Sequence, residues 1–135
     1  MDQEKSQESQ DGCPFCNLVQ DRIVAANDHA VAFFDGFPIS PGHVLIVPRR
    51  HVASFFDVSK EERRDLFALL TIMREKLVQE KKADGFNVGI NDGEAAGQTV
   101  LHLHIHLIPR FSGDMPDPRG GVRWIFPQKA VYWSR

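Results

Sequence analysis

The sequence is short of cysteine, has no long apolar run and carries no surplus of basic charge, and each shortage excludes a class of protein. Its two cysteines, Cys13 and Cys16, lie close together, and in a cytoplasmic chain we expect no structural disulfide between them. No run of about 18 apolar residues occurs, so we expect no membrane-spanning segment and no membrane partner. The formal net charge of −2 argues against a non-specific nucleic-acid binder, although a small nucleotide needs only a few local donors.

The N-terminus also lacks apolar side chains. Residues 1–11 contain no large apolar residue except the initiator methionine. Such a segment cannot bury enough surface to offset the entropy of ordering it, so we predict a disordered tail. It has no apolar stretch like that of a secretory signal peptide, and we therefore expect a cytoplasmic protein.

The rest of the chain has the content of one globular domain, with 135 residues in all and 42% hydrophobic residues. Ser59 and Glu62 have the spacing of a capping box, and apolar residues then recur with helical period as far as Leu77. This pattern predicts one long helix that begins at Ser59 and is stopped by Asp84-Gly85. Short runs bounded by glycine and proline predict strands at 30–35, 43–48, 86–91 and 102–109. We therefore expect an α+β domain with an antiparallel sheet.

Three histidines alternate with large apolar residues in the last of these runs. Residues two apart in a strand share a face, so the histidines would lie together and the apolar residues would face the core. The histidines are His102, His104 and His106, and the apolar residues are Leu101, Leu103, Ile105 and Leu107. Two chemistries suit such a row. Neutral imidazoles bind zinc, iron or copper, and alternatively one imidazole acts as a nucleophile while its neighbours orient it.

A turn-rich loop, residues 93–99, leads directly into the histidine segment. Glycine allows close approach to the backbone there, and Gln98 and Thr99 offer neutral donors suited to phosphate oxygens. The loop does not match a phosphate-binding P-loop, because Gln98 stands where that motif requires lysine and a strand, not a helix, follows.

Two stretches of the chain resemble the histidine triad (HIT) superfamily. Residues 97–110, GQTVLHLHIHLIPR, are similar to its signature, and residues 34–48, FDGFPISPGHVLIVP, are similar to its other characteristic stretch. The resemblance implies a HIT domain at 12–113, with an antiparallel sheet of about five strands, one long helix and a short N-terminal helix. Residues 114–135 lie outside the resemblance, and we expect them to form an extension packed on the same domain.

The resemblance implies catalytic roles for residues of both stretches. In the family the middle histidine attacks the α-phosphorus of a nucleotide and forms a covalent nucleotidyl-histidine, which water or another acceptor resolves. His104 stands at that position. His106 matches the residue that hydrogen-bonds the phosphate or the leaving group, and His43 matches a supporting histidine beneath the site. Gln98 and Thr99 match donors to the phosphates.

The resemblance also implies residues that bind the nucleoside. Asp35 matches an acidic position that accepts hydrogen bonds from ribose hydroxyls, and Asn91 stands where the family places an amide. The residues aligned with the apolar wall around the base are Phe15, Leu18 and Phe33. Without the resemblance, Asp35 would be interpreted as a turn residue and the three apolar residues as core.

Some members of the superfamily have a Cys-x-x-Cys pair, which Cys13-Pro14-Phe15-Cys16 resembles. Together with His51 and His102, the two cysteines would form a closed tetrahedral structural Zn²⁺ site that ties the N-terminal segment to the histidine segment. A redox pair and two free thiols remain as alternatives, although a redox motif should follow a strand and here a polar tail precedes it. No organic cofactor is expected.

The resemblance is nearest to the fragile histidine triad branch, the dinucleoside polyphosphate hydrolases. The expected partner is therefore a small-molecule nucleotide, first of all a dinucleoside polyphosphate. Asn91 and the Cys-x-x-Cys pair depart from that branch, and a nucleoside phosphoramidate, the substrate of the Hint branch, is the alternative. A histidine-ligated metalloenzyme and a non-catalytic nucleotide-binding module also remain open. Because family members are commonly homodimers, we expect a homodimer.

Overall fold

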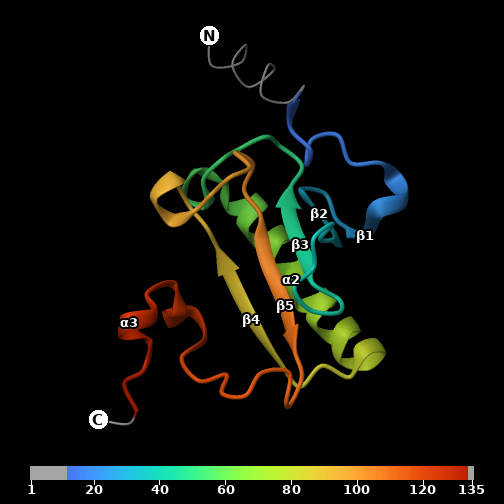
Figure 1. Cartoon of the computed structure of the whole chain (residues 1–135). Helices are drawn as coiled ribbons and strands as arrows, with labels where there is room; N and C mark the ends of the chain where they lie inside the picture. Colours follow the sequence, from blue (N-terminus) through green and yellow to red (C-terminus); the bar gives the residue numbers. More distant parts are fainter. Residues whose placement is uncertain (1–11, 134–135) are drawn as a thin grey trace.

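The computed structural model describes residues 12–133, so the predicted tail at 1–11 lies outside the described residues. Within this range the chain forms an antiparallel sheet of five strands in the order β1-β2-β3-β5-β4, with the long helix α2 on one face (Figure 1). The strands are β1 (Ile23–Ala26), β2 (Ala30–Phe34), β3 (Val44–Pro48), β4 (Gly85–Ile90) and β5 (Ile105–Arg110), and α2 is Lys60–Lys81. This confirms the predicted α+β class.

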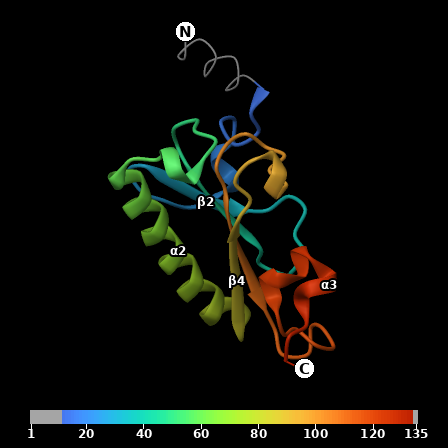
Figure 2. The same ribbon diagram turned by 90° about the vertical axis from the view of Figure 1, so that its left-hand side faces the viewer.

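Short helices complete the described chain. A 3₁₀ turn, η1 (Gln20–Arg22), precedes the sheet, where a short N-terminal helix was predicted. The others are η2 (Phe55–Asp57), η3 (Glu94–Ala96), η4 (Gly121–Ile125) and α3 (Pro127–Ala130). Elements η4 and α3 belong to residues 114–133, the C-terminal extension, which lies on the side of the sheet opposite α2 (Figure 2).

Helix α2 begins as the sequence predicts and ends earlier. The Ser59 hydroxyl accepts from the Glu62 amide and the Glu62 carboxylate accepts from the Ser59 amide, which completes the capping box. The helix ends at Lys81, because Lys82 adopts a left-handed conformation, and not at Asp84-Gly85. Its buried apolar residues, Leu66, Leu69, Met73 and Leu77, pack on the inner face of the sheet.

Strands β2 and β3 have apolar residues on both faces. Alternate residues pack with α2: Ala30, Ala32, Val44 and Ile46. The others form a second cluster on the outer face: Val31, Phe33, Leu45 and Val47. Phe15, Leu18 and Ile23 pack against this second cluster. The outer face is thus covered from the N-terminal segment at β2 and β3, and it faces the C-terminal extension at β4.

The histidine segment forms a shorter strand than predicted. Strand β5 begins at Ile105, so His102 and His104 precede it and only His106 of the three belongs to it. In the preceding segment the Leu103 amide donates to the carbonyl of Val52 at 2.7 Å, which is a loop-to-loop contact and not part of the sheet ladder. Leu101 is 62% exposed, so its predicted place on the core-facing side is wrong. Leu103, Ile105 and Leu107 nevertheless lie in the core as predicted, and the rings of His104 and His106 are in contact.

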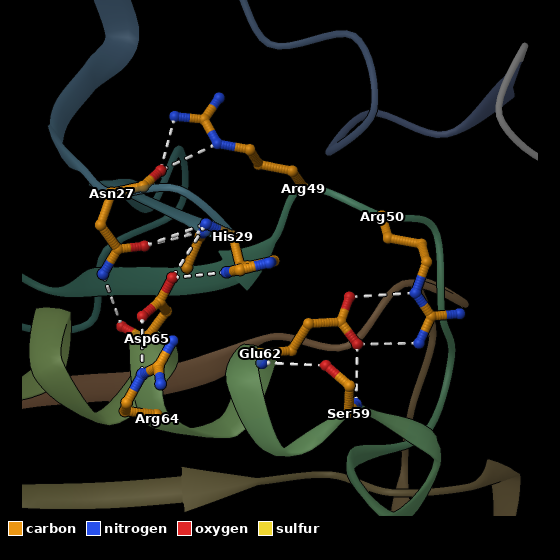
Figure 3. Close-up of polar contacts among 9 residues, drawn as sticks. Asn27, His29, Arg49, Arg50, Ser59, Glu62, Arg64 and Asp65 are labelled. Atoms are coloured by element: carbon orange, nitrogen blue, oxygen red, sulfur yellow. Dashed lines mark hydrogen bonds and ion pairs between the residues drawn. The ribbon is translucent and has the colours of Figure 1, made fainter.

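Ion pairs fasten the N-terminal part of α2 to the segment after β3 and to the turn before β2 (Figure 3). Both carboxylate oxygens of Glu62 accept from the guanidinium of Arg50, at 2.8 and 3.0 Å. Asp65 accepts from Nδ1 of His29 at 2.7 Å. Because Arg50 immediately precedes His51, the first of these pairs also fixes the approach to a candidate metal ligand.

Candidate active site and metal centre

One ring nitrogen of His104 is hydrogen-bonded to the backbone, and the other is available. Its Nδ1 lies 2.9 Å from the carbonyl oxygen of His102. Because a carbonyl can only accept, Nδ1 carries a proton, so in the neutral imidazole the lone pair lies on Nε2. The ring is mostly buried and is contacted by Phe15, at a centroid distance of 5.1 Å, and by His106, at 5.2 Å. The His102 carbonyl therefore selects the tautomer in which Nε2 of His104 can attack an electrophile.

His43 and His106 form a hydrogen-bond relay beside it. The Ile39 amide donates to Nδ1 of His43, so Nε2 of His43 carries the proton and donates to Nδ1 of His106 at 2.9 Å. His106 must then carry its own proton on Nε2. Burial, reinforced by neighbouring His104 and His43, lowers the pKa of His106 to about 4, and burial lowers that of His43. Both rings are therefore neutral near pH 7, and His106 is a neutral N–H donor.

A Pro-Gly turn places His43 in this relay. The His43 amide donates to the Ser40 carbonyl at 3.0 Å, which closes a turn with Pro41 and Gly42 at its centre. Gly42 has a φ of +88°, and a Cβ at this position would lie 2.8 Å from Cδ2 of Leu77. Only glycine therefore fits, both for its backbone conformation and for the space beside α2.

Asp35 borders the relay. One carboxylate oxygen accepts from the Phe37 amide at 2.9 Å, and the other lies 3.5 Å from Nε2 of His43. Asp35, His43 and His106 are close enough together to hold a metal ion. However, the His43 nitrogen that faces the other two residues carries a proton, and the Ile39 amide prevents that proton from moving to Nδ1. The arrangement is thus better suited to passing a hydrogen bond to His106 than to binding a cation.

Two cysteines and two histidines converge on the other side of His104. Nε2 of His102 donates to the Pro48 carbonyl at 2.8 Å, so the Nδ1 lone pair faces Sγ of Cys13 at 3.3 Å and Sγ of Cys16 at 3.4 Å. Nδ1 of His51 lies 3.2 Å from Sγ of Cys16. Ligands of a tetrahedral zinc ion with ordinary Zn–S and Zn–N bonds lie about 3.5 Å apart.

The environment of this group also suits a metal. Burial lowers the pKa of both His51 and His102, which keeps the imidazoles neutral. Burial and the adjacent Cys13 raise the pKa of Cys16 to about 12 when no cation is present. A divalent cation would supply the charge that two neighbouring thiolates need. The structure therefore brings together the four predicted ligands, Cys13, Cys16, His51 and His102, in a group compatible with zinc.

The two predicted phosphate donors, Gln98 and Thr99, differ in burial and in the hydrogen bonds that their side chains already make. Gln98 is buried, and its amide donates to the carbonyls of Ala53 and Val100 while its oxygen accepts from the Gly93 amide. In this arrangement Gln98 stabilises the loop, and its role toward phosphate stays a prediction. Thr99 is exposed in the same loop, and so is Asn91 at the end of β4.

The predicted base wall lies next to His104. Phe15 is half-buried and contacts both His104 and Phe33, and Leu18 packs on the same cluster. Phe33 is only 1% exposed, because Phe15 and the guanidinium of Arg22 cover its ring. Phe15 and Leu18 thus offer the surface, and Phe33 supports them from below.

A cavity of about 720 Å³ lies on the other side, where His106 reaches the surface. Asp35, His43, His106 and Asn91 line it, but His104 and the predicted base wall do not. Its remaining walls include residues that sequence reasoning missed, among them Val88, Met115, Val122 and Trp124. The extension carried no pattern that could have assigned it to the site, since its structure could not be predicted from its proline, glycine and arginine residues.

This sheet, with one long helix and histidines at the start of its β5 strand, defines a protein of the histidine triad class. The sequence profile of the HIT domain matches residues 18–113, most of the chain, and the chain belongs to the HIT family. An uncharacterised HIT-like protein of Saccharolobus solfataricus is 42% identical over 109 residues, which are 78% of each chain. A bis(5'-adenosyl)-triphosphatase of Saccharomyces cerevisiae is 41% identical over 95 residues, which are 70% of this chain and 46% of that one.

Solved structures agree with this assignment. The NitFhit protein of C. elegans superposes with a TM-score of 0.71 and 35% identity, over 75% of this chain and 24% of that one. A zinc-bound histidine triad family protein of Mycobacterium smegmatis superposes with a TM-score of 0.71 and 30% identity, over 80% of this chain and 86% of that one. Within residues 12–133, none of the helices has both the length and the apolar character needed to cross a membrane.

Proposed function

We propose that this chain is a nucleotidyl hydrolase or transferase that attacks the α-phosphorus of a nucleotide with Nε2 of His104. The observation that carries the proposal is the hydrogen bond from Nδ1 of His104 to the His102 carbonyl. It leaves the lone pair of Nε2 available, so no base has to remove a proton before attack. Membership of the HIT family and the similarity to a bis(5'-adenosyl)-triphosphatase support this chemistry.

The reaction then takes two displacements. In the first, Nε2 of His104 forms a bond to phosphorus, and the bond from phosphorus to the leaving oxygen breaks with its electron pair on that oxygen. The leaving oxygen of a polyphosphate needs a hydrogen bond more than a proton at neutral pH, and the Nε2–H of His106 is suited to donate one. In the second, water attacks phosphorus, the P–N bond breaks, and its electron pair returns to His104 while a proton from water passes to solvent.

Other residues of the site fit the binding of a nucleotide. The free acceptor capacity of Asp35 suits ribose hydroxyls, and Phe15 and Leu18 offer an apolar surface beside His104. A dinucleoside polyphosphate is the first substrate to test, because the yeast relative carries that activity in its name. A nucleoside phosphoramidate is the second.

We also propose that Cys13, Cys16, His51 and His102 hold a structural zinc ion. When bound, the ion supplies a rigid tetrahedral link and no reacting group. The four side chains would fix the position of His102, whose carbonyl oxygen accepts a hydrogen bond from Nδ1 of His104. The link thus stabilises the N-terminal segment and orients the nucleophile through one backbone group.

The test is release of AMP from diadenosine triphosphate by the native protein and by His104→Asn, each with and without a chelator. The asparagine amide can still donate to the His102 carbonyl, but it has no nucleophilic nitrogen. We expect His104→Asn to lose activity, and the native protein to form an acid-labile, base-stable AMP adduct visible by intact mass spectrometry. The matched control is His29→Asn, since His29 pairs with Asp65 elsewhere and should not affect turnover.

Each outcome distinguishes the classes of function. Turnover by His104→Asn would exclude the histidine nucleophile. Loss of native activity with chelator, at unchanged fold by circular dichroism and with no AMP adduct on the native protein, would indicate a metalloenzyme. If diadenosine triphosphate is not cleaved, an adenosine phosphoramidate is tested next. Binding of AMP without turnover of either substrate would indicate a nucleotide-binding module.

A further inference from the structure

The C-terminal extension forms one wall of the cavity that His106 lines. The extension follows residue 113, where the match to the HIT domain ends. Asp35, His43 and His106 lie on one side of the cavity, and Met115, Val122 and Trp124 lie on the other. Its volume, about 720 Å³, is within the range of pockets that bind a small organic ligand.

Polar contacts hold this wall in place. The guanidinium of Arg110, at the end of β5, bonds both carboxylate oxygens of Asp114 at 2.8 and 2.9 Å and the side chain of Asn87 on β4 at 2.7 Å. Nε1 of Trp124 donates to the carbonyl of Arg119 at 2.9 Å. Gly121 has a φ of +42°, and a Cβ there would lie 3.1 Å from the Asn87 amide. The extension is therefore attached to the sheet close beside β4.

The fixed wall leaves apolar side chains uncovered. Val122 is 71% exposed and Trp124 is 44% exposed, and Val88 on β4 is also exposed in the same cavity. Exposed apolar surface inside a concave site favours a ligand that covers it. The indole of Trp124 in addition offers a flat face on which an aromatic ring can stack.

The position of the cavity places it on the leaving-group side of the substrate. In a phosphoryl displacement the attacking and leaving atoms lie on opposite sides of phosphorus. His106 lines the cavity and His104 does not, so a phosphorus atom held between them would direct its leaving group into the cavity. The predicted base wall, Phe15 and Leu18, lies at His104, on the side of the nucleoside that is retained, and a ribose bound by Asp35 would lie at the border between this side and the cavity.

The charges of the cavity limit what the leaving group can be. Its charged side chains are Asp35, Arg110 and Asp114, and Arg110 is already paired with Asp114. His43 and His106 are neutral near pH 7 because burial lowers the pKa of each. The cavity therefore offers little positive charge for a bare polyphosphate, which would bind more weakly than a leaving group with an apolar ring.

We infer that the cavity between the C-terminal extension and strands β4 and β5 binds a ring-bearing leaving group, which stacks against Trp124. This inference rests on the proposed nucleotidyl transfer and narrows its substrate class. The second nucleoside of a dinucleoside polyphosphate is such a group, whereas the pyrophosphate released from ATP is not.

The experiment compares kcat/KM for AMP release from diadenosine triphosphate with that from ATP. We expect the native protein to favour the first substrate, and Trp124→Ala to lower the ratio about tenfold, the size of one lost base–aromatic contact. Phe126→Ala is the matched control, since Phe126 is an exposed aromatic residue of the extension that does not line the cavity. Val122→Asp tests the wall without removing the hydrogen bond of Trp124, and it should lower the ratio as well.

Binding is measured separately from turnover. The chain has two tryptophans, so in the Trp133→Phe protein the fluorescence reports on Trp124. We expect saturable quenching by ADP and none by pyrophosphate. If AMP release depends on His104 but the ratio is the same in all variants, the inference is wrong and the proposed function stands. If no substrate releases AMP, the proposed function fails, and quenching by ADP would still support a ring-binding cavity, while its absence would overturn it.

A second copy of the chain is the other possible occupant of the wall. If Val122→Asp converts a dimer into a monomer in analytical ultracentrifugation and leaves the substrate ratio unchanged, the wall is a contact between copies. That result would overturn the inference.

Discussion

His102 and His106 each stand two residues from His104, yet the structure gives them opposite surroundings. His102 is fully buried, with Nε2 bonded to the Pro48 carbonyl and Nδ1 facing two thiols. His106 is half-buried, with Nδ1 bonded to His43, and it lines an open cavity. His104 lies between a closed group of potential metal ligands on one side and a hydrogen-bond relay on the other.

The difference shows that sequence spacing does not give two histidines the same role. Because β5 begins only at Ile105, the backbone before it is free to turn His102 toward Cys13 and Cys16 while His106 stays on the sheet. Both sides contribute to the environment of His104. The His102 carbonyl fixes its tautomer, and His106 places an N–H donor beside it. Substitutions on the His106 side should therefore mainly affect catalysis, and substitutions on the His102 side should mainly affect stability.

The largest effect is expected on the relay side. His106→Asn removes the proposed hydrogen bond to the leaving oxygen, and we expect kcat to fall by about 10²–10⁴-fold, the usual contribution of a positioned proton-transfer or hydrogen-bonding group. The melting temperature should stay within a few degrees, since His106 is only half-buried. AMP release and a thermal melt measure the two quantities. An unchanged kcat would place the leaving-group contact on another residue.

Metal removal should have the second-largest effect, and mainly on stability. If zinc is bound at a free concentration of 100 times its Kd, it stabilises the folded state by about 2.7 kcal/mol. Cys16→Ser should lose this contribution, which lowers the melting temperature by about 10 °C for a domain of this size. Zinc content by mass spectrometry should fall from one ion per chain to none. If the native protein contains no zinc and its melting temperature does not change with chelator, the two cysteines are free thiols and the zinc proposal is wrong.

The sequence predicted most of the elements that carry these two sides, but not all of their bounds. Capping by Ser59 and Glu62, the helical period of α2 and the continuous apolar run of β3 are local signals, and each predicted an element. Strand β1 was missed among the residue runs, because Ile23–Ala26 is short and apolar throughout and its pairing with β2 has an irregular register. The length of β5 was overestimated, because alternation of His and Leu describes a strand equally well whether or not a partner strand is present.

Long-range contacts explain what else could not be predicted. The pairing of His43 with His106 joins residues 63 positions apart, and Cys13 meets His102 across 89 positions. Resemblance to a family placed these residues in the same sites, although it did not pair His43 with His106, and composition and spacing could do neither. Neither the resemblance nor a sequence pattern could predict the cavity wall at Trp124, since the extension lies outside the resemblance and shows no periodic pattern.

A smaller effect is expected from the ion pair that fixes the approach to His51. Glu62 accepts two hydrogen bonds from Arg50, which lower the pKa of its carboxyl group. Glu62→Gln keeps an acceptor for the capping box but loses the charge, and we expect a loss of about 1–2 kcal/mol in the free energy of unfolding by urea. The matched control is Glu61→Gln on the exposed side of the same turn. Equal losses in both variants would show that general helix charge, and not the Arg50 pair, is responsible.

The last effect, which is absent near pH 7 and appears only in acid, is the pH dependence that the relay contributes to stability. His106 has a pKa of about 4 in the folded protein, lowered by burial and by its neighbours His104 and His43, against about 6.5 in an unfolded chain. Between these values the unfolded chain binds a proton that the folded protein does not, so stability is complete above about pH 6.5 and is lost as the pH falls toward about 4. In His106→Asn this contribution is absent, and its melting temperature should fall less than that of the native protein from about pH 7 to about pH 4.5. Parallel curves for the two proteins would mean that His106 takes up its proton without unfolding, and the relay would then be open to water and not held neutral by burial.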